Sequence, residues 1–339
     1  MIVGADPKGG KGRGVVVSCS YEARKFGVRS GMPISRAFSV CPDAIYVRPD
    51  FAYYGKVSRR VMDLLRKFPD RFEQVSIDEA FLDVTERVHG DYDRARELAV
   101  TIKAELEAKE GLLSSIGVAP NKSSAKIASE FQKPDGLTVV PRNELGGFLA
   151  PLPVSAISGV GKKTEGFLNS INVRTVGDLQ KIPGQQLVKY FGKTGVWLWG
   201  VANGLEKIEF KERPMRSLSA EHTFDQDVSE RSFVLSKVGE LATRLHGRVV
   251  ASKVEFRVVG IKIRFTHFQT YTRENTLPFF TNNLETMVKE SRNLLREFEK
   301  NPRKVRLIGI FVADFRDKEE ISGGETFSLD GSLVNSNIE

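Results

Sequence analysis

The sequence is poor in the residues that hold small secreted domains together. It contains two cysteines, Cys19 and Cys41, and four scattered histidines, which cannot form a disulfide framework and lack the spacing of a zinc site. No apolar run is long enough to cross a bilayer, and the N-terminal residues have neither the basic flank nor the apolar stretch of a signal peptide. We therefore expect a cytoplasmic protein that works in a reducing compartment and does not bind a membrane.

What the sequence does contain is typical of a soluble chain with more than one domain. Its 339 residues are too many for one compact core. Hydrophobic residues make up 40% and charged residues 28%, a composition that argues against long disordered segments. There are 51 Lys and Arg for 43 Asp and Glu, so the net charge is +8. That excess allows an anionic partner without identifying one.

Hydrophobic periodicity divides the chain into three regions. Up to about residue 140, strands and helices alternate without a strict repeat, which indicates an α/β or α+β layer. Residues 145–212 have helical periodicity with short Gly and Pro breaks. From residue 217 the order is β-α-β-β-α-β, the split pattern of a ferredoxin-like domain. Its elements are expected at residues 217–224, 227–252, 254–268, 270–277, 285–300 and 305–315.

Two adjacent carboxylates, Asp78 and Glu79, stand in the middle of an apolar segment. In a straight strand these side chains would point to opposite faces, so they converge only if the chain bends there. Converging carboxylates repel each other unless a divalent cation neutralises them, and hard oxygen ligands suit Mg²⁺. The plain alternative is a solvent-facing turn, because Asp and Glu are mostly exposed. The apolar neighbours Ile77 and Phe81 favour a buried strand that carries the acids.

A basic segment near the N-terminus has the residues to hold a phosphate. From Lys8 to Arg36 there are seven basic residues and one acid. Arg24 lies three residues after Tyr21 at the start of an expected helix, so both side chains can share one face. A phosphate could meet Arg24, the hydroxyl of Ser18 and the helix amides. The alternative is a solvated basic loop with a buried tyrosine.

A Gly-Val-Gly turn in the helical region resembles a helix-hairpin-helix motif. Gly159 and Gly161 would expose backbone amides to a DNA phosphate, and Lys162 and Lys163 follow directly. Such a contact does not depend on base sequence. The alternative is an ordinary glycine-containing turn between two helices.

A second basic stretch lies in the C-terminal region, with seven basic residues and one acid between Arg244 and Arg273. Within it, Lys262 and Arg264 alternate with apolar residues, as expected of a strand with one buried face and one charged face. The charged face could lie along duplex phosphates, which predicts a steep salt dependence. The alternative is a face that serves only solubility.

Four segments in one order carry a resemblance to a known family. They are Tyr21-Glu-Ala-Arg-Lys25, Ser76-Ile-Asp-Glu-Ala80, Ser115-Ile-Gly-Val-Ala-Pro-Asn-Lys122 and Lys133-Pro-Asp-Gly136. With these separations the sequence closely resembles the Y-family translesion DNA polymerases of the archaeal and bacterial DNA polymerase IV group. The resemblance implies an α+β right-hand fold. Its parts would be fingers at 1–50, palm at 51–145, a thumb with the helix-hairpin-helix at 146–210, a linker at 211–216, a ferredoxin-like little finger at 217–318 and a flexible tail at 319–339.

The resemblance also implies a role for each motif. Asp78 and Glu79 resemble the palm carboxylates of two-metal catalysis, Glu79 being the active-site acid, so two Mg²⁺ ions are the expected cofactor. The residues that resemble the grip on the incoming nucleotide are Tyr21, Arg24 and Lys133 at the triphosphate, with Ser18 near it. The implied partners are primer-template DNA and dNTPs, and we expect a monomer. Residues 325–333 faintly resemble peptides that bind a sliding clamp, although they lack the terminal aromatic pair.

One part of the family pattern is not found. The family begins with a strand that bears a third metal-binding aspartate, whereas the segment from Met1 to Asp6 resembles the second strand of that pattern. Neither Asp6 nor Asp83 stands where it could replace the missing acid. We therefore expect a palm sheet without a central strand, a weak Mg²⁺ site and severely impaired polymerase activity.

Two functions remain as alternatives. The first is a DNA-templated DNA polymerase of the low-fidelity, lesion-bypass type that acts in DNA repair and damage tolerance. The second is a non-catalytic protein that binds damaged or primer-template DNA and has a defunct palm. Mg²⁺-dependent nucleotide incorporation distinguishes them. A nucleotide cyclase on a related palm is disfavoured by the helix-hairpin-helix and the little finger.

Overall fold

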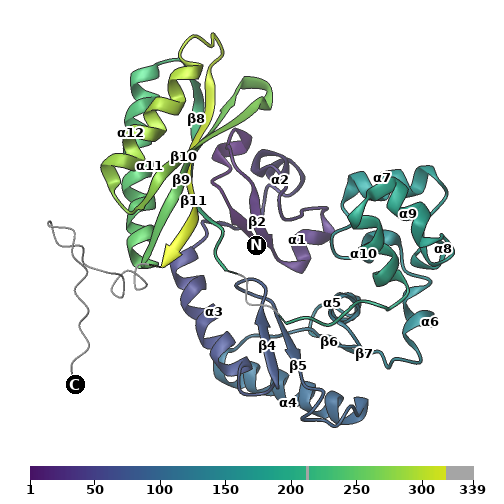
Figure 1. Cartoon of the computed structure of the whole chain (residues 1–339). Coiled ribbons are helices and arrows are strands. Elements are labelled where there is room, and N and C mark those ends of the chain that lie inside the picture. Colours follow the sequence, from purple (N-terminus) through teal and green to yellow (C-terminus); the bar gives the residue numbers. More distant parts are fainter. Residues whose placement is uncertain (211–213, 318–339) are drawn as a thin grey trace, which may run out of the picture. The chain divides into compact units, whose positions relative to one another are not determined.

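The structure is a computed structural model that describes residues 1–210 and 214–317 of the chain. Its contacts form two compact units, one made of Met1–Pro49 with the segment from Arg213 onward and the other of Asp50–Glu212. Figure 1 labels the elements of both. The expected tail at 319–339, the clamp-like residues 325–333 and residues 211–213 of the expected linker lie outside the described residues. In the described ranges, no helix has the length and apolar character needed to cross a membrane.

The N-terminal segment is a small sheet with short helices. Strand β1 lies between β2 and β3, antiparallel to the first and parallel to the second. Ile2 of β1 is fully buried. The Ser20 hydroxyl accepts the Ala23 amide at 3.4 Å and so begins α1, as the sequence predicts. The elements are β1 (Ile2–Gly4), η1 (Lys8–Gly10), β2 (Val16–Cys19), α1 (Tyr21–Lys25), α2 (Ile34–Val40) and β3 (Tyr46–Val47).

The next part of the chain folds as two separate two-stranded sheets on a helical layer. Strands β4 and β5 are antiparallel, and β6 and β7 are parallel. Leu82 of β5 and Ile116 of β6 pack against the same buried cluster from α3 and α4. In the described residues, β5 and β6 therefore share a helical support without being paired to each other. The elements are α3 (Phe51–Leu65), β4 (Arg71–Gln74), β5 (Ala80–Asp83), α4 (Tyr92–Glu110), β6 (Ile116–Val118), α5 (Lys122–Phe131) and β7 (Leu137–Val139).

Helix α5 packs directly on β6. A Cβ on Gly117 would lie 2.1 Å from the Ala125 carbonyl oxygen and 2.4 Å from the Ser129 amide. Only glycine fits there, because no side chain can stand between strand and helix. The Asn121 side chain accepts the Ser124 amide at 2.9 Å and begins the helix. The Ser115–Lys122 motif therefore fixes where α5 starts and how closely it lies on the sheet.

The helical region expected at 145–212 is confirmed as a cluster of short helices up to Ala202, whereas residues 205–210 are in neither helix nor strand. Its core is made of buried leucines, isoleucine and valines, and the two tryptophans pack against it. The Thr175 side chain accepts the Asp178 amide at 3.1 Å, and the Asp178 carboxylate accepts the Thr175 amide at 3.0 Å, a reciprocal cap on α8. The elements are α6 (Leu145–Leu149), η2 (Val154–Ala156), α7 (Lys162–Ser170), α8 (Val176–Gln180), α9 (Gly184–Phe191) and α10 (Lys193–Ala202).

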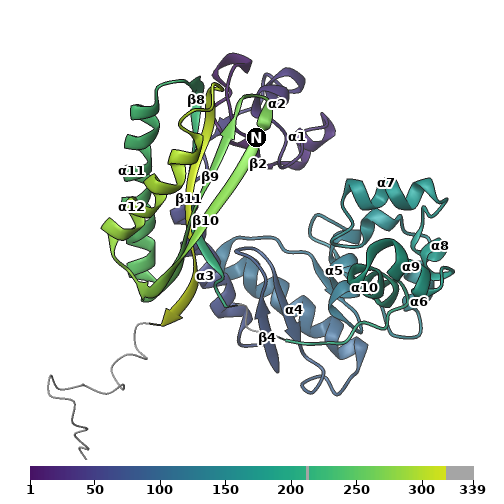
Figure 2. The same ribbon diagram turned by 45° about the horizontal axis from the view of Figure 1, so that its top comes forward.

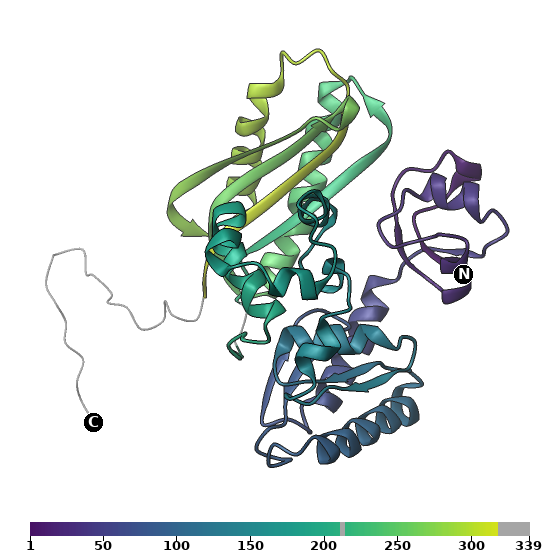
Figure 3. The ribbon, with the colours of Figure 1, turned by 90° about the vertical axis from the view of Figure 1, so that its right-hand side faces the viewer.

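The C-terminal segment has the predicted β-α-β-β-α-β order. Its sheet order is β10-β9-β11-β8, and all neighbours are antiparallel. Because β8 and β9 are both antiparallel to β11, they are parallel to each other with β11 between them, so the β-α-β unit is split. Figures 2 and 3 show both long helices on one face of this sheet. The elements are β8 (Ser217–Val228), α11 (Arg231–Ala251), β9 (Val254–Phe265), η3 (Thr266–Phe268), β10 (Thr270–Thr281), α12 (Leu284–Leu295), η4 (Arg296–Phe298) and β11 (Val305–Asp317).

Five predicted boundaries in this segment are wrong, among them the end of the helix expected at 285–300, which stops at Leu295. Strand β8 continues to Val228, because Val228 still pairs with Val305 of β11, and the helix predicted from residue 227 starts at Arg231. Strand β9 ends at Phe265, before the turn of η3. Strand β10 continues to Thr281, which pairs with Phe256 beyond an irregularity in the register. Pairing with distant strands extends β8 and β10 beyond their local patterns, whereas the turn of η3 shortens β9.

Candidate active site and nucleic-acid surfaces

The two adjacent acids lie in the bend between β4 and β5. The amides of Val75 and Ser76 both donate to the Glu79 carbonyl, at 2.9 and 3.2 Å, and close the turn. The predicted bend is therefore confirmed. The expectation of a buried strand is wrong, since the last β4–β5 pair is Gln74 with Ala80 and the side chain of Ile77 is 54% exposed. Asp78 is exposed and Glu79 is partly exposed.

A chain of alternating charges joins the bend to the Lys133 motif. The Lys126 ammonium of α5 contacts the Glu79 carboxylate and also Glu130, at 3.0 Å. Glu130 in turn accepts a bond from Lys133 at 2.6 Å. The structure thus brings together Glu79 and Lys133, two residues that were assigned to one site from the sequence. Lys126 was missed, although its spacing of four residues from Glu130 on a helix predicts their pairing.

Lys126 and Glu130 of this network are both charged at neutral pH. Burial acts to lower the pKa of Lys126, but the hydrogen bonds to Glu79 and Glu130 outweigh burial and raise that pKa. Burial acts to raise the pKa of Glu130, but hydrogen bonds from Lys133 and Lys126 lower it overall. Lys126 is therefore a cation and Glu130 an anion around pH 7.

Other carboxylates near the bend have partners of their own. Glu73 of β4 is buried and contacts Lys122. Asp83 of β5 accepts bonds from the Arg71 side chain at 3.0 Å and the Thr85 hydroxyl at 2.6 Å. Throughout residues 1–210 and 214–317, no group of three or more metal-ligating side chains is found. The remaining acids of the bend are Asp78, which accepts the Ser76 hydroxyl at 2.6 Å, and Glu79, which contacts Lys126.

This donor set fits Mg²⁺ by its chemistry. Asp78 and Glu79 offer hard carboxylate oxygens at an accessible turn. Mg²⁺ is commonly held by one or two carboxylates and takes its remaining ligands from water and substrate phosphates. Two carboxylates are enough to hold such an ion weakly, and Lys133 stands at the end of the same charge network.

The predicted phosphate-gripping residues of the basic segment share one face. The Arg24 guanidinium lies 5.5 Å from the centre of the Tyr21 ring, and its Nε donates to the Cys19 carbonyl at 3.3 Å. Tyr21 is 45% exposed, so the alternative of a buried tyrosine is wrong. Ser18 is exposed on β2. These residues belong to the first unit and the acidic bend to the second, and their common role stays a prediction.

The Gly159–Gly161 turn has an accessible backbone. Gly159 has φ +103°, and a Cβ there would lie 3.0 Å from the Trp197 ring, so this position requires glycine. Gly161 precedes α7, whose N-terminus has no side-chain cap. Lys162 and Lys163 are exposed, and neither has an ion-pair partner in the described part of the chain. Open amides with two free cations are suited to a phosphate.

The sheet face that carries Lys262 and Arg264 is charged in both signs. Ile261 and Ile263 are buried, so the predicted alternation along β9 is confirmed. However, Lys262 bonds both oxygens of Glu221 at 2.9 and 3.1 Å. They meet across Gly309, which pairs with both residues and has no side chain to separate them. Arg264 donates to the Thr270 hydroxyl at 2.8 Å. The charged face of β9 therefore has an acidic partner for Lys262, and its role in DNA binding stays a prediction.

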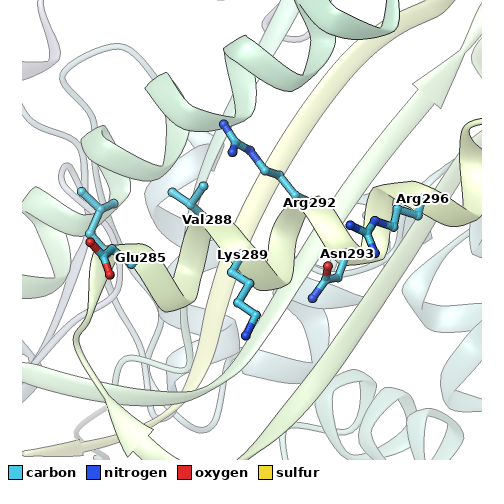
Figure 4. Close-up of a pocket in the computed structure, with 7 residues that line it drawn as sticks. Glu285, Val288, Lys289, Arg292, Asn293 and Arg296 are labelled. Atoms are coloured by element: carbon cyan, nitrogen blue, oxygen red, sulfur yellow. The ribbon is translucent and has the colours of Figure 1, made fainter.

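A groove with a volume of about 440 Å³ runs along α12. Figure 4 shows that Lys289 and Arg292 of this helix and Arg296 of η4 point in different directions and do not converge. None of the predicted site residues lines it, so the candidate active site is an open surface at the acidic bend.

Three family models match successive parts of the chain. Residues 1–130 match the impB/mucB/samB family and residues 215–324 match its C-terminal domain. Residues 155–206 match the thumb domain of DNA polymerase-iota. The matched ranges include the acidic bend, the Gly159–Gly161 turn and the four-stranded sheet. The similarity therefore extends over both units.

Individual relatives match nearly the whole chain. It is 47% identical over 311 residues to DNA polymerase IV of Methanoculleus marisnigri. The aligned residues cover 91% of this chain and 86% of that relative. A Y-family DNA polymerase chimera of Dbh and Dpo4 is 29% identical with a TM-score of 0.85, over 94% of this chain and 92% of that one. An insertion ternary complex of Dbh DNA polymerase is 28% identical with a TM-score of 0.65. This match covers 93% of this chain and 92% of the Dbh chain.

Proposed function

This chain belongs to the DNA polymerase IV group of the Y-family lesion-bypass DNA polymerases, and on that basis we propose that Asp78 and Glu79 hold Mg²⁺ for nucleotidyl transfer. The observation that supports this assignment is the β4–β5 bend. It places two adjacent carboxylates at the surface, and one of them, Glu79, is connected through Lys126 and Glu130 to Lys133. We propose a monomer that acts in the cytoplasm on primer-template DNA with dNTPs as substrates.

Each residue has a part in this proposal that follows from its charge. Bound divalent ions supply charge neutralisation at the primer 3′-oxygen and the triphosphate. Asp78 and Glu79 provide the oxygen ligands. Lys133 and Arg24 offset the negative charge of the triphosphate and the departing pyrophosphate, while Tyr21 and Ser18 donate hydroxyl hydrogen bonds near it. These roles come from the family resemblance and agree with the exposure of each side chain.

DNA contacts are proposed at two surfaces. The amides at Gly159 and Gly161, with Lys162 and Lys163, bind the backbone of the duplex. On the C-terminal sheet, Lys262 and Arg264 bind phosphates. One similar solved structure is an insertion ternary complex of a DNA polymerase, which supports a nucleic-acid role for this fold.

We further propose that the 339-residue chain by itself is a slow polymerase. Two observations support this. No group of three or more potential metal ligands is found among the described residues, so no third ligand joins Asp78 and Glu79 there. In addition, β5 and β6 each pair with one strand only in the described ranges, so the site rests on two short sheets instead of one continuous one. The same observations favour the second candidate function, a DNA-binding protein without catalysis.

Primer extension distinguishes these functions. The purified 339-residue chain is assayed with primer-template DNA, dNTPs and Mg²⁺, beside the Methanoculleus marisnigri relative. We expect slow, Mg²⁺-dependent incorporation that Glu79→Gln lowers by about a hundredfold or more. Glu105→Gln, a partly exposed acid on α4 that pairs with Lys109, is the matched control and should leave the rate unchanged. Extension as fast as the relative's would contradict the impaired site, and no incorporation with intact DNA binding would support the non-catalytic function.

A further inference from the structure

Lys126 forms an ion pair with Glu79, the carboxylate that the proposed function assigns to a metal ion. Its ammonium group contacts Glu79 from the neighbouring helix α5. The side chain of Lys126 is 24% exposed and that of Glu79 41% exposed. The pair is thus partly shielded from water, where an ion pair is stronger than on an open surface. None of the sequence motifs or family roles involves Lys126.

We propose that Lys126 is a positioning residue that neutralises Glu79 in the metal-free chain and is displaced when a divalent cation binds. This inference rests on the proposed metal role of Asp78 and Glu79. Adjacent carboxylates repel each other, and the ammonium group of Lys126 offsets that repulsion and holds Glu79 in place. A divalent cation brings twice the charge to both carboxylates and can replace it.

A second partner makes the exchange possible without leaving Lys126 unpaired. Glu130 lies four residues further along α5 and contacts Lys126 at 3.0 Å. When Glu79 binds a metal ion, Lys126 remains paired with the Glu130 carboxylate. A half-buried cation that lost its only partner would be costly, and Glu130 removes that cost.

The expected size of the effect follows from the strength of such pairs. Partly exposed ion pairs contribute modestly to stability, so removing the competitor should strengthen divalent-cation binding by about threefold to fivefold. A larger change would require a deeply buried pair. The effect should depend on the positive charge of residue 126 and not on its packing.

The test measures metal binding without catalysis. The full chain, without DNA or nucleotide, is titrated with Mn²⁺ at constant pH, and free Mn²⁺ is followed by electron paramagnetic resonance. Lys126→Met should lower the dissociation constant about threefold to fivefold, whereas Lys126→Arg should leave it near the wild-type value. Lys133→Met is the matched control, because it removes the same charge from Glu130 without touching Glu79. If Lys126→Met does not fold, Lys126→Gln replaces it.

The outcomes separate the role of Lys126 from the role of the metal site. Tighter binding in Lys126→Met alone supports the inference. Unchanged binding in Lys126→Met, or equal tightening in Lys133→Met, overturns it while the metal role stands. If Glu79→Gln binds Mn²⁺ as well as the wild type does, the proposed metal role itself fails, and the inference fails with it.

Discussion

Lys262 of β9 and Glu221 of β8 are joined by two hydrogen bonds of 2.9 and 3.1 Å across the glycine of an intervening strand. The pair spans three neighbouring strands of the sheet and is possible because Gly309 has no side chain. The lysine that was predicted from the sequence to bind DNA is therefore held by an internal partner. Any DNA phosphate must compete with Glu221 for it.

Replacing Glu221 with Gln should strengthen DNA binding. The change releases Lys262 and removes a negative charge from the sheet face, so we expect about twofold to threefold tighter binding at low salt. The gain should disappear at high salt, because exposed charges are screened. Fluorescence anisotropy with a labelled primer-template duplex measures it. Glu274→Gln, an exposed acid of β10 on the same sheet, is the control; an equal gain there would show that Glu221 acts only through net charge.

Reversing both basic residues of β9 should weaken binding to every DNA sequence alike. We expect the double substitution Lys262→Glu and Arg264→Glu to raise the dissociation constant by about tenfold or more at low salt and to flatten its salt dependence, since the two proposed phosphate contacts would be lost. Titrations at several salt concentrations with two unrelated duplexes give both quantities. An unchanged affinity and salt slope would exclude this face from the DNA interface.

Substituting Gly159 should damage both the thumb and the DNA contact that we propose for it. An alanine would have to adopt φ +103° beside the Trp197 ring, so Gly159→Ala should cost about 1 kcal/mol or more of stability. The phosphate-facing amides would shift, and duplex affinity should fall. Gly166→Ala is the matched control, because this helix position in α7 has open space around it and an ordinary φ. Gly159→Ala with wild-type melting temperature and affinity would contradict the prediction.

Stability in acid should depend on Asp83. Burial acts to raise the pKa of Asp83, but hydrogen bonds from Thr85 and Arg71 lower it below its ordinary value of 3.8. A carboxyl group with a lowered pKa in the folded state stabilises the fold above its unfolded pKa, and this stabilisation is lost as pH falls through the folded value. Asp83→Asn should therefore be less stable at pH 7 by about 1 kcal/mol and equal to the wild type in strong acid.

Urea unfolding followed by the fluorescence of Trp197 and Trp199, which lie in the same unit as Asp83, tests this at pH 7 and at pH values below 3.8. The two proteins should converge as the pH is lowered. If the free energies of unfolding of the wild type and Asp83→Asn differ equally at both pH values, Asp83 stabilises the fold through its packing and not through its charge.

The fold was largely predictable because local patterns determine it. Alternating apolar residues in β9 and the helical periodicity of α4 and α11 depend on burial of one face, which a sequence displays directly. The element order of the C-terminal domain is confirmed for that reason. The ends of β8 and β10 were not predictable, because they are set by partners such as Val305 and Phe256, far away in the chain.

The candidate site was predictable only in part. Asp78 and Glu79 are adjacent and framed by apolar residues, so the sequence singles them out. Lys126 and Glu221 carry no such signal, since each becomes important through a contact between separate elements. The charge of a residue is visible in a sequence, whereas the partner that neutralises it is not.

The tight contact of α5 with β6 at Gly117 has a mechanical consequence. With no side chain between backbone and backbone, the helix cannot slide or roll without carrying the strand along. Lys126 and Glu130 ride on that helix, and Lys133 follows it by two residues. A single spectroscopic label on the exposed side of α5 would therefore report the motion of all three charges at once. It would also report any displacement of the helix when an ion binds at Glu79.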